Sequence, residues 1–295
     1  MEDRKILVTG ASGFIGINYF NMSMFKNNLH RSVVRHETID SIILTNIESI
    51  IHLAGKAHEM GVIEDEIYFK ANRDLAFDLA KRAKLKGVKQ FIYLSSVKVY
   101  GKDSSEIILD ENTPCQPNDA YGKSKLEAEQ KLLTLQDISF TVSIIRPPLV
   151  YGAHVKGNMI KLLTLANSSK PLPFGNINNH RSMVFVGNLV ALIDVLIEKK
   201  ISGIFIAGDE KPISTTYLLQ TIRQKMSRPL RLFGLPKFVL WILKEARPDL
   251  IKRLFYSFVT DTNKTNQKLK FKPPYTTAQG IEYMVKWYRH FSESK

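Results

Sequence analysis

Short apolar segments alternate with longer amphipathic segments over the first half of the chain, and this order constrains the fold more than any other feature. Apolar runs that end in glycine or polar turns are typical of buried parallel strands. Strands that alternate with helices form βαβ units, in which helices cover both faces of a parallel sheet. We therefore expect strands at residues 6–8, 32–34, 49–54, 90–95 and 141–145.

Helices are expected between these strands, at residues 14–25, 66–85 and 121–136. The combination predicts a Rossmann-type, doubly wound α/β domain that binds a dinucleotide over residues 1–150.

The alternation weakens after Pro148, where proline and glycine become frequent and the later segments are more helical. We predict that residues 180–208 return to the Rossmann domain. Residues 151–179 and 209–295 are predicted to form a smaller, mostly α-helical domain that binds substrate. Element bounds of this kind are expected to shift by a few residues.

Composition excludes several classes of protein. One cysteine, Cys115, rules out an internal disulfide framework and is typical of a reducing compartment, so we expect a cytoplasmic location. The charged start of the chain runs directly into the first strand and leaves little room for a signal peptide. No apolar run approaches the roughly 20 residues that cross a membrane, so we expect no stable membrane insertion. No metal site is assigned.

The longest apolar run, Phe238 to Leu243, has the length of a short helix core. We expect it to pack against the body of the protein. Because Lys237 and Lys244 flank it, contact with a membrane surface remains the alternative.

The formal net charge of +14 would attract nucleic acids, anionic lipids and phosphorylated small molecules alike. The lysines and arginines are scattered, and no aromatic-basic motif accompanies them. We therefore expect no nucleic-acid partner, whereas a substrate that carries a pyrophosphate is compatible with the charge.

A glycine triad follows the first strand and opens the first helix. Gly10 permits a tight turn, Gly13 lets the backbone approach a pyrophosphate, and Gly16 lets the helix pack on the strand. The helix N-terminus then presents N–H groups to the anion. The spacing is Gly-x-x-Gly-x-x-Gly, so its place in the βαβ unit matters more than the triad itself.

Arg35 closes the predicted second strand, where an acidic side chain would bind the adenosine ribose of NAD. An arginine there would complement the 2′-phosphate of NADP instead. Glu37 lies close enough to weaken this inference, and a solvated surface arginine is the alternative. The residues therefore favour NADP without excluding NAD.

Two further segments carry chemistry. Tyr121 and Lys125 lie four residues apart at the start of a predicted helix, so their side chains share one helical face. We expect the ammonium, helped by a nicotinium ring, to lower the pKa of the phenol for acid–base work. Ser95 and Ser96 follow a predicted strand at the carboxyl edge of the sheet, where open α/β sheets bind ligands.

Together these motifs resemble the extended short-chain dehydrogenase/reductase family, and within it the nucleotide-sugar epimerases, dehydratases and 4-keto-reductases. The resemblance extends over most of the chain. It rests on segments 8–16, 51–55, 94–101, 121–125 and 146–152, and on Asn72.

The resemblance implies a role for each matching residue. Ser96, Tyr121 and Lys125 match the catalytic residues of the family. Lys98, Asn158 and Arg181 match substrate contacts, with Arg181 on the diphosphate, and Ser96 and Tyr121 also touch substrate. The implied contacts to the dinucleotide are Gly10, Ser12, Gly13, Phe14, Ile15, Gly16, Arg35, Leu53, Ala54, Asn72, Ser95, Tyr121, Lys125 and Pro148.

The sequence departs from the family in the region that binds adenosine. Only about 15 residues separate Arg35 from Ile51, so the third strand and its acidic residue are predicted to be short or missing. Asn188 stands where the family often has aspartate.

The leading functional hypothesis is a UDP-sugar 4-epimerase that uses NAD or NADP. The alternative is an NADPH-dependent reductase of a UDP-4-keto-6-deoxy-sugar in surface polysaccharide synthesis, which Arg35 and Lys98 favour. A dehydratase is disfavoured because Val97 and Lys98 stand where that reaction needs an acidic pair. A non-catalytic dinucleotide-binding regulator would have no need of the Tyr/Lys pair. The resemblance also implies a homodimer.

Overall fold

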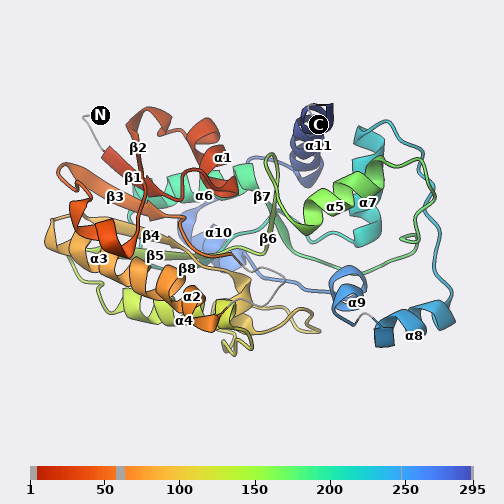
Figure 1. Ribbon diagram of the computed structural model, residues 1–295, viewed down its shortest axis with the longest axis horizontal. Coiled ribbons are helices and arrows are strands. Elements are labelled where there is room, and N and C mark those ends of the chain that lie inside the picture. Colours follow the sequence, from red (N-terminus) through yellow and green to blue (C-terminus); the bar gives the residue numbers. More distant parts are fainter. Residues whose placement is uncertain (1–4, 58–63, 247, 294–295) are drawn as a thin grey trace.

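The computed structural model describes residues 5–57, 64–246 and 248–293, and a parallel sheet forms the centre of this part of the chain (Figure 1). Its strand order is β2-β1-β3-β4-β5-β8. The strands are β1 (Lys5–Thr9), β2 (Leu29–Ser32), β3 (Ile47–His52), β4 (Gln90–Leu94), β5 (Thr141–Arg146) and β8 (Gly203–Ile206). The chain leaves β1 toward β2 and then returns to the other side of β1 as β3. This reversal confirms the predicted Rossmann-type sheet, and sheets of this kind bind ligands at the carboxyl ends of the strands where the order reverses.

Helices cover both faces of the sheet because alternate strand residues point to opposite faces. Ile6 and Val8 pack on the side of α1 and α6, whereas Leu7 and Ile50 pack on the side of α3 and α4. In Figure 1 these two helical layers lie above and below the strands. The covering helices are α1 (Phe14–Met22), α3 (Leu75–Leu85), α4 (Ala120–Leu133) and α6 (Val186–Lys199).

The predicted second strand was misplaced. β2 ends at Ser32, where the prediction began, and Val34 instead packs with Ile42 and Leu44 in the core beneath α3. Val33 is 74% exposed, so only Val34 anchors this loop to the core. β2 itself is polar because it is an edge strand that pairs only with β1.

Residues 33–46, all of them described, contain no strand. They form a loop around a short 3₁₀ segment, η2 (His36–Ser41), before β3 begins. The sheet therefore ends at β2, and the strand predicted to be short or missing is missing.

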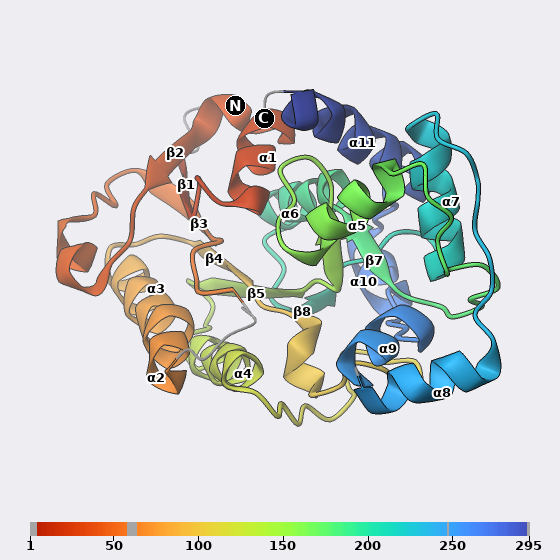
Figure 2. The same cartoon turned by 45° about the vertical axis from the view of Figure 1, so that its right-hand side comes forward.

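The C-terminal half contributes a second, two-stranded parallel sheet of β6 and β7. Tyr151 and Phe185 from these strands pack with side chains of α5, α7 and α11, which gather beside the main sheet in Figure 2. Residues 203–206 return to the main sheet as β8. The division into a Rossmann domain and a smaller domain stays a prediction.

The remaining elements are β6 (Leu149–Tyr151), β7 (Met183–Phe185), α2 (Asp65–Tyr68), α5 (Asn158–Asn167), α7 (Thr215–Lys225), α8 (Lys237–Ala246), α9 (Pro248–Phe255), α10 (Asn263–Leu269), α11 (Thr277–Glu293) and the short segments η1 (Lys26–Asn28), η3 (Phe69–Asp74) and η4 (Val97–Tyr100).

The apolar run at 238–243 forms a helix, α8. We expected this run to pack against the body of the protein, but one face of the helix is exposed. Val239 and Leu240 are half-buried, while Phe238 and Trp241 are each 67% exposed and Ile242 is 54% exposed. α8 lies at the outer edge of the molecule in both views. Within the described residues, no helix has both the length and the apolar character to cross a membrane.

Candidate active site

The glycine turn packs against the loop that follows β3. Gly10 has φ +70°, and a Cβ there would lie 2.6 Å from the backbone nitrogen of Ala54. A Cβ at Gly16 would lie 2.3 Å from the carbonyl oxygen of Gly10. These contacts leave no room for a side chain at either position, so the turn stays flat and close to the start of α1. Among the described residues, no side chain caps this end of α1, whose N-cap is Gly13.

Leu53 and Ala54 lie beside this turn, as the resemblance implies. The Ala54 N–H donates to Thr9 Oγ1 (3.3 Å), and the Leu53 N–H donates to the Thr9 carbonyl (3.3 Å). Thr9 Oγ1 also lies 2.9 Å from Nδ1 of the buried His52. The two loops at the carboxyl ends of β1 and β3 are therefore tied together.

The remaining residues of the predicted loop line the same turn. Ser12 is exposed, and Phe14 and Ile15 are half-buried at the start of α1. Arg35 is not part of the glycine turn or of the loop after β3. It is exposed and follows the end of β2 by three residues, so it does not close a strand.

Asn72 lies in η3, a π-helical turn that interrupts the long predicted helix between α2 and α3. Its amide donates to the carbonyl of Lys56 (3.1 Å) and to Ser124 Oγ (3.0 Å), and its oxygen accepts from the Lys56 N–H (2.9 Å). π-turns of this kind are frequent at functional sites. Here the turn aims a fully buried amide at both the loop after β3 and the helix that carries Tyr121.

Tyr121 and Lys125 lie in the first turns of α4, which begins after its N-cap Asp119. The Asp119 carboxylate accepts a hydrogen bond from the Gly122 N–H (2.6 Å), and this cap fixes the helix start beside β4. A hydrogen bond joins Tyr121 to Ser96, the N-cap of η4 just beyond β4. The structure thus brings Tyr121 and Ser96 together, and Lys125 lies one helical turn further along α4.

We expected the Lys125 ammonium to lower the pKa of the Tyr121 phenol. For the protein without coenzyme, this expectation was wrong. Burial raises the pKa of Tyr121 to about 12, and only the hydrogen bond from Ser96 opposes this rise. The Lys125 ammonium instead donates to the Leu94 carbonyl (2.8 Å) and lies 4.6 Å from the centre of the Tyr93 ring. Burial lowers the pKa of Lys125 to about 7. Loss of solvation is therefore the largest cause of the raised pKa of Tyr121.

A buried ion pair behind the site was missed by sequence reasoning. Arg146 at the end of β5 and Glu129 in α4 are 3% and 2% exposed, and Arg146 Nη2 donates to Glu129 Oε2 (2.5 Å). Ser95, a predicted cofactor contact, donates its hydroxyl to Glu129 and so belongs to this buried cluster. Glu129 follows Lys125 by four residues, and this helical spacing was the one available signal.

Pro148 is buried just past the carboxyl end of β5, two residues after the arginine of this ion pair. It therefore lies at the same sheet edge as Ser95 and Ser96.

The predicted substrate contacts are arranged around one loop and one helix start. Lys98 forms an ion pair with Asp103, and Arg181 Nη1 donates to the carbonyl of Asp103 (3.5 Å) and to that of Tyr256 (2.9 Å). Burial lowers the pKa of Arg181, and Asp103 opposes this. Asn158 is the exposed first residue of α5.

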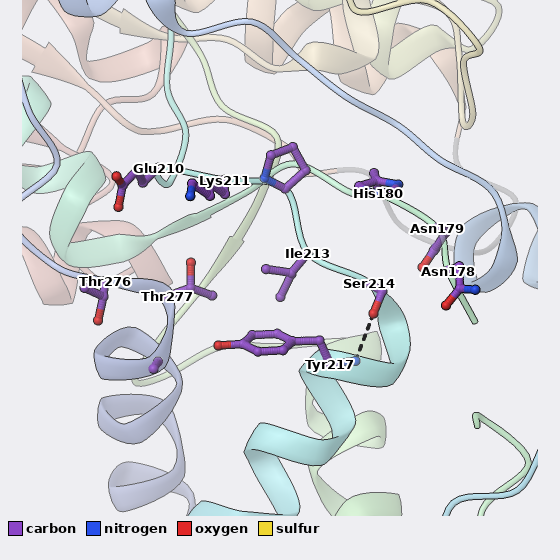
Figure 3. Close-up of a pocket in the computed structure, with 12 residues that line it drawn as sticks. Asn178, Asn179, His180, Glu210, Lys211, Ile213, Ser214, Tyr217, Thr276 and Thr277 are labelled. Carbon is purple, nitrogen blue, oxygen red and sulfur yellow. Dashed lines mark hydrogen bonds between the residues drawn. The ribbon is translucent and has the colours of Figure 1, made fainter. Parts of the chain in front are cut away.

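A hollow of about 650 Å³ lies elsewhere, between the residues after β8 and the starts of α7 and α11 (Figure 3). Lys211, Ser214 and Tyr217 line it, and Ser214 Oγ accepts from the Tyr217 N–H (3.0 Å). None of the predicted catalytic residues lines this hollow. His180 connects it with the neighbouring Arg181.

The comparisons with known proteins agree with this geometry. The sequence pattern of the NAD dependent epimerase/dehydratase family matches residues 6–208. A UDP-glucose 4-epimerase of Vibrio cholerae is 33% identical over 312 residues, which cover 95% of this chain and 94% of that protein. The chain belongs to the NAD dependent epimerase/dehydratase family. This membership confirms the predicted family, the enzymatic character and the nicotinamide coenzyme class.

Two further proteins are similar over nearly the whole chain. An N-acetyl-alpha-D-glucosaminyl-diphospho-ditrans,octacis-undecaprenol 4-epimerase of Escherichia coli O157:H7 is 25% identical, covering 97% of this chain and 96% of its own. The crystal structure of a UDP-glucuronic acid 4-epimerase from Bacillus cereus with NAD is 19% identical with a TM-score of 0.76, covering 97% of this chain and 99% of that one. The latter likeness shows that this family member has the fold of that enzyme.

Asn188, which replaces the aspartate frequent in the family, keeps a carboxylate nearby. Its amide donates to Asp209 Oδ1 (2.7 Å), and Asp209 also accepts from the Tyr151 hydroxyl (2.6 Å) and the Phe185 N–H (2.9 Å). Burial raises the pKa of Asp209, and these donors oppose the rise. A carboxylate from the segment after β8 thus ties β6 to β7.

Proposed function

We propose that this family member is a nucleotide-sugar 4-epimerase that uses NAD or NADP. The observation that carries the proposal is the hydrogen bond between Tyr121 and Ser96 at the carboxyl end of β4. This edge of the sheet also holds the glycine turn, so an acid–base phenol and a dinucleotide would meet in the same crevice. The 33% identity to a protein named UDP-glucose 4-epimerase, over 95% of this chain, supports the same activity.

The residues around the glycine turn fit a dinucleotide. A Cβ at Gly10 would fill the space between the turn and Leu53, so the absence of side chains keeps the backbone open to a pyrophosphate. Asn72 and Lys125 would hold the nicotinamide half from the other side. When bound, the nicotinamide supplies hydride chemistry by accepting a hydride from carbon 4 of the sugar and returning it.

Tyr121 performs the proton transfer in this proposal. Its phenolic oxygen takes the proton of the sugar C4 hydroxyl and later returns it, while Ser96 shares a hydrogen bond with the same sugar oxygen and aligns it. Because the pKa of Tyr121 alone is about 12, the phenolate needs a nearby positive charge, which a nicotinium ring would supply.

Arg181 and Asn158 are proposed to bind the diphosphate of the substrate. Arg181 already has its guanidinium oriented by the carbonyl groups of Tyr256 and Asp103. A planar fork oriented in this way suits phosphate oxygens. Lys98, which pairs with Asp103, lies two residues from Ser96 and is proposed to contact the sugar side of the substrate.

A reductase of a UDP-4-keto-6-deoxy-sugar is the second candidate. The exposed Arg35 past the end of β2 favours it, because an arginine at this edge could bind the 2′-phosphate of NADPH. The same Tyr121 would then donate its proton once, and NADPH would be consumed rather than recycled.

Product analysis separates the two activities. The purified protein is incubated with one equivalent of NAD and with UDP-glucose, UDP-N-acetylglucosamine or N-acetylglucosaminyl-diphospho-undecaprenol in separate reactions. We expect many turnovers to a 4-epimer with at least one of them. Stoichiometric NADPH oxidation by a UDP-4-keto-6-deoxy-sugar, without epimer formation, would establish the reductase instead. If neither reaction occurs although the dinucleotide binds, both candidates fail.

A further inference from the structure

α8 presents an apolar face that the described protein leaves uncovered. Phe238, Trp241 and Ile242 have the i, i+3, i+4 spacing of one helical face and are all more than half exposed. We call these three residues the α8 face. Phe233, in the segment that leads into α8, is 48% exposed as well. Other exposed apolar residues, such as Ile138 between α4 and β5, do not share a helical face with large apolar neighbours of this kind.

The segment that carries the α8 face is rich in positive charge. Residues 228–256 contain seven lysines and arginines and two acidic residues, a net charge of +5. Of the basic residues, Arg228, Arg231, Lys244 and Lys252 are exposed. An apolar face among exposed cations is complementary to an anionic, partly apolar surface.

We infer that α8 docks this protein onto an anionic lipid bilayer, with the α8 face in the headgroup region. The helix has 10 residues, which is about 15 Å and half of a hydrocarbon core, so it would lie in the interface and not cross the bilayer. Tryptophan and phenylalanine are favoured at this depth, and the neighbouring cations would meet anionic headgroups.

The position of α8 links this surface to the proposed substrate site. α9 follows α8 directly, and the two helices pack together. The carbonyl of Lys252 at the end of α9 accepts a hydrogen bond from Arg181 Nη1 (3.4 Å), as does the carbonyl of Tyr256 just after it (2.9 Å). A bilayer under α8 would therefore lie close to the residue proposed to hold the diphosphate.

A second copy of the chain is a poorer occupant of the same face. A symmetric pair would bring the α8 face of each copy together, and with it the positive charge of 228–256 from both copies. That repulsion is absent at an anionic bilayer.

Vesicle binding tests the inference directly and needs no substrate. The full chain is mixed with vesicles of phosphatidylethanolamine and phosphatidylglycerol, or of phosphatidylcholine alone, and separated by flotation. We expect binding to the anionic vesicles that weakens with added salt, and little binding to the neutral ones. The double variant Phe238→Gln, Trp241→Gln should partition at least about tenfold less, because two large apolar side chains no longer enter the interface.

Fluorescence locates the contact. The chain has two tryptophans, and the Trp287→Phe variant leaves Trp241 as the only one. Its emission should shift to shorter wavelength with anionic vesicles, since a 67% exposed indole would leave water. The matched control is Ile138→Gln, which removes an exposed apolar side chain far from α8 along the chain and should bind as the parent does.

Three results would overturn the inference. They are no binding to anionic vesicles, equal binding by the double variant and the parent, or equal binding to neutral and anionic vesicles. If sedimentation shows that the double variant dissociates an oligomer while vesicle binding is absent, the α8 face is a contact between copies of the chain. The Tyr121→Phe variant should bind vesicles as the parent does. Failure of vesicle binding and failure of the proposed catalysis can therefore be told apart.

Discussion

The main sheet holds the side chains around β4 and β5 by buried bonds, whereas its other side, at β2, is exposed. Around β4 and β5, α4 is fixed by the Glu129–Arg146 ion pair, by the Asp119 cap and by the amide of Asn72. At the opposite edge, β2 pairs on one side only, no further strand follows it among residues 33–46, and Arg35 is exposed.

The difference shows which part of the site requires a fixed geometry. Proton transfer depends on the relative positions of atoms within a fraction of an ångström, so its residues belong on rigid elements held by buried bonds. The adenosine part of the dinucleotide takes no part in the reaction, so its binding site does not require the same precision. We infer that the β4–β5 half carries the chemistry, and that the β2 edge contributes modestly to dinucleotide affinity.

The largest effect is expected for Tyr121→Phe. Removal of the hydroxyl eliminates the acid–base group, so kcat should fall by about 10² to 10⁴-fold. Binding of the dinucleotide should change little. Steady-state turnover and equilibrium dialysis measure the two quantities, and Tyr217→Phe, a change in the hollow of Figure 3, is the control. Comparable loss in both variants would place the chemistry elsewhere.

Glu129→Ala tests the rigid half of the comparison. Arg146 would be left buried without its partner, so the free energy of unfolding should fall by about 3–5 kcal/mol. Glu127→Ala in the same helix breaks a partly exposed pair with Arg73 and should cost less than about 1 kcal/mol. Urea denaturation of both variants gives the values. A similar loss for each would contradict the assigned difference in burial.

Coenzyme binding should change the pKa of Tyr121. Burial holds it near 12 in the protein alone, so the phenol stays protonated up to about that pH. A bound nicotinium ring favours the phenolate, and we expect the pKa to fall by at least about one unit. The difference in ultraviolet absorbance between the parent and Tyr121→Phe, titrated with and without NAD, reports it. An unchanged titration would remove the proposed activation.

The smallest effect is expected for Arg35→Ala. An exposed charge is screened, so its loss should weaken NADP binding by less than about tenfold and leave NAD binding unchanged. Arg31→Ala is the matched control, because Arg31 also lies at the β2 edge but has its guanidinium over the Phe20 ring (4.5 Å). Equal effects on NAD and NADP would show that Arg35 does not read the 2′-phosphate.

Much of the fold could be predicted because its signals are local. Apolar strands, the glycine turn after β1 and the loss of a strand after Arg35 are all legible in consecutive residues. The misplacement of β2 came from the same rule, since Val33 and Val34 have more strand character than Leu29 to Ser32. Only packing beneath α3 decided that Val34 belongs to a loop.

The sequence by itself determined which side chains could react, because Tyr121 and Lys125 are one helical turn apart in any α-helix. It could not determine the pKa of either, because desolvation depends on neighbours such as Tyr93 and Leu94 that only the folded chain supplies. Nor could it show which side of α8 faces water, since both sides of that helix are apolar. Tertiary packing covered one side and left the other exposed.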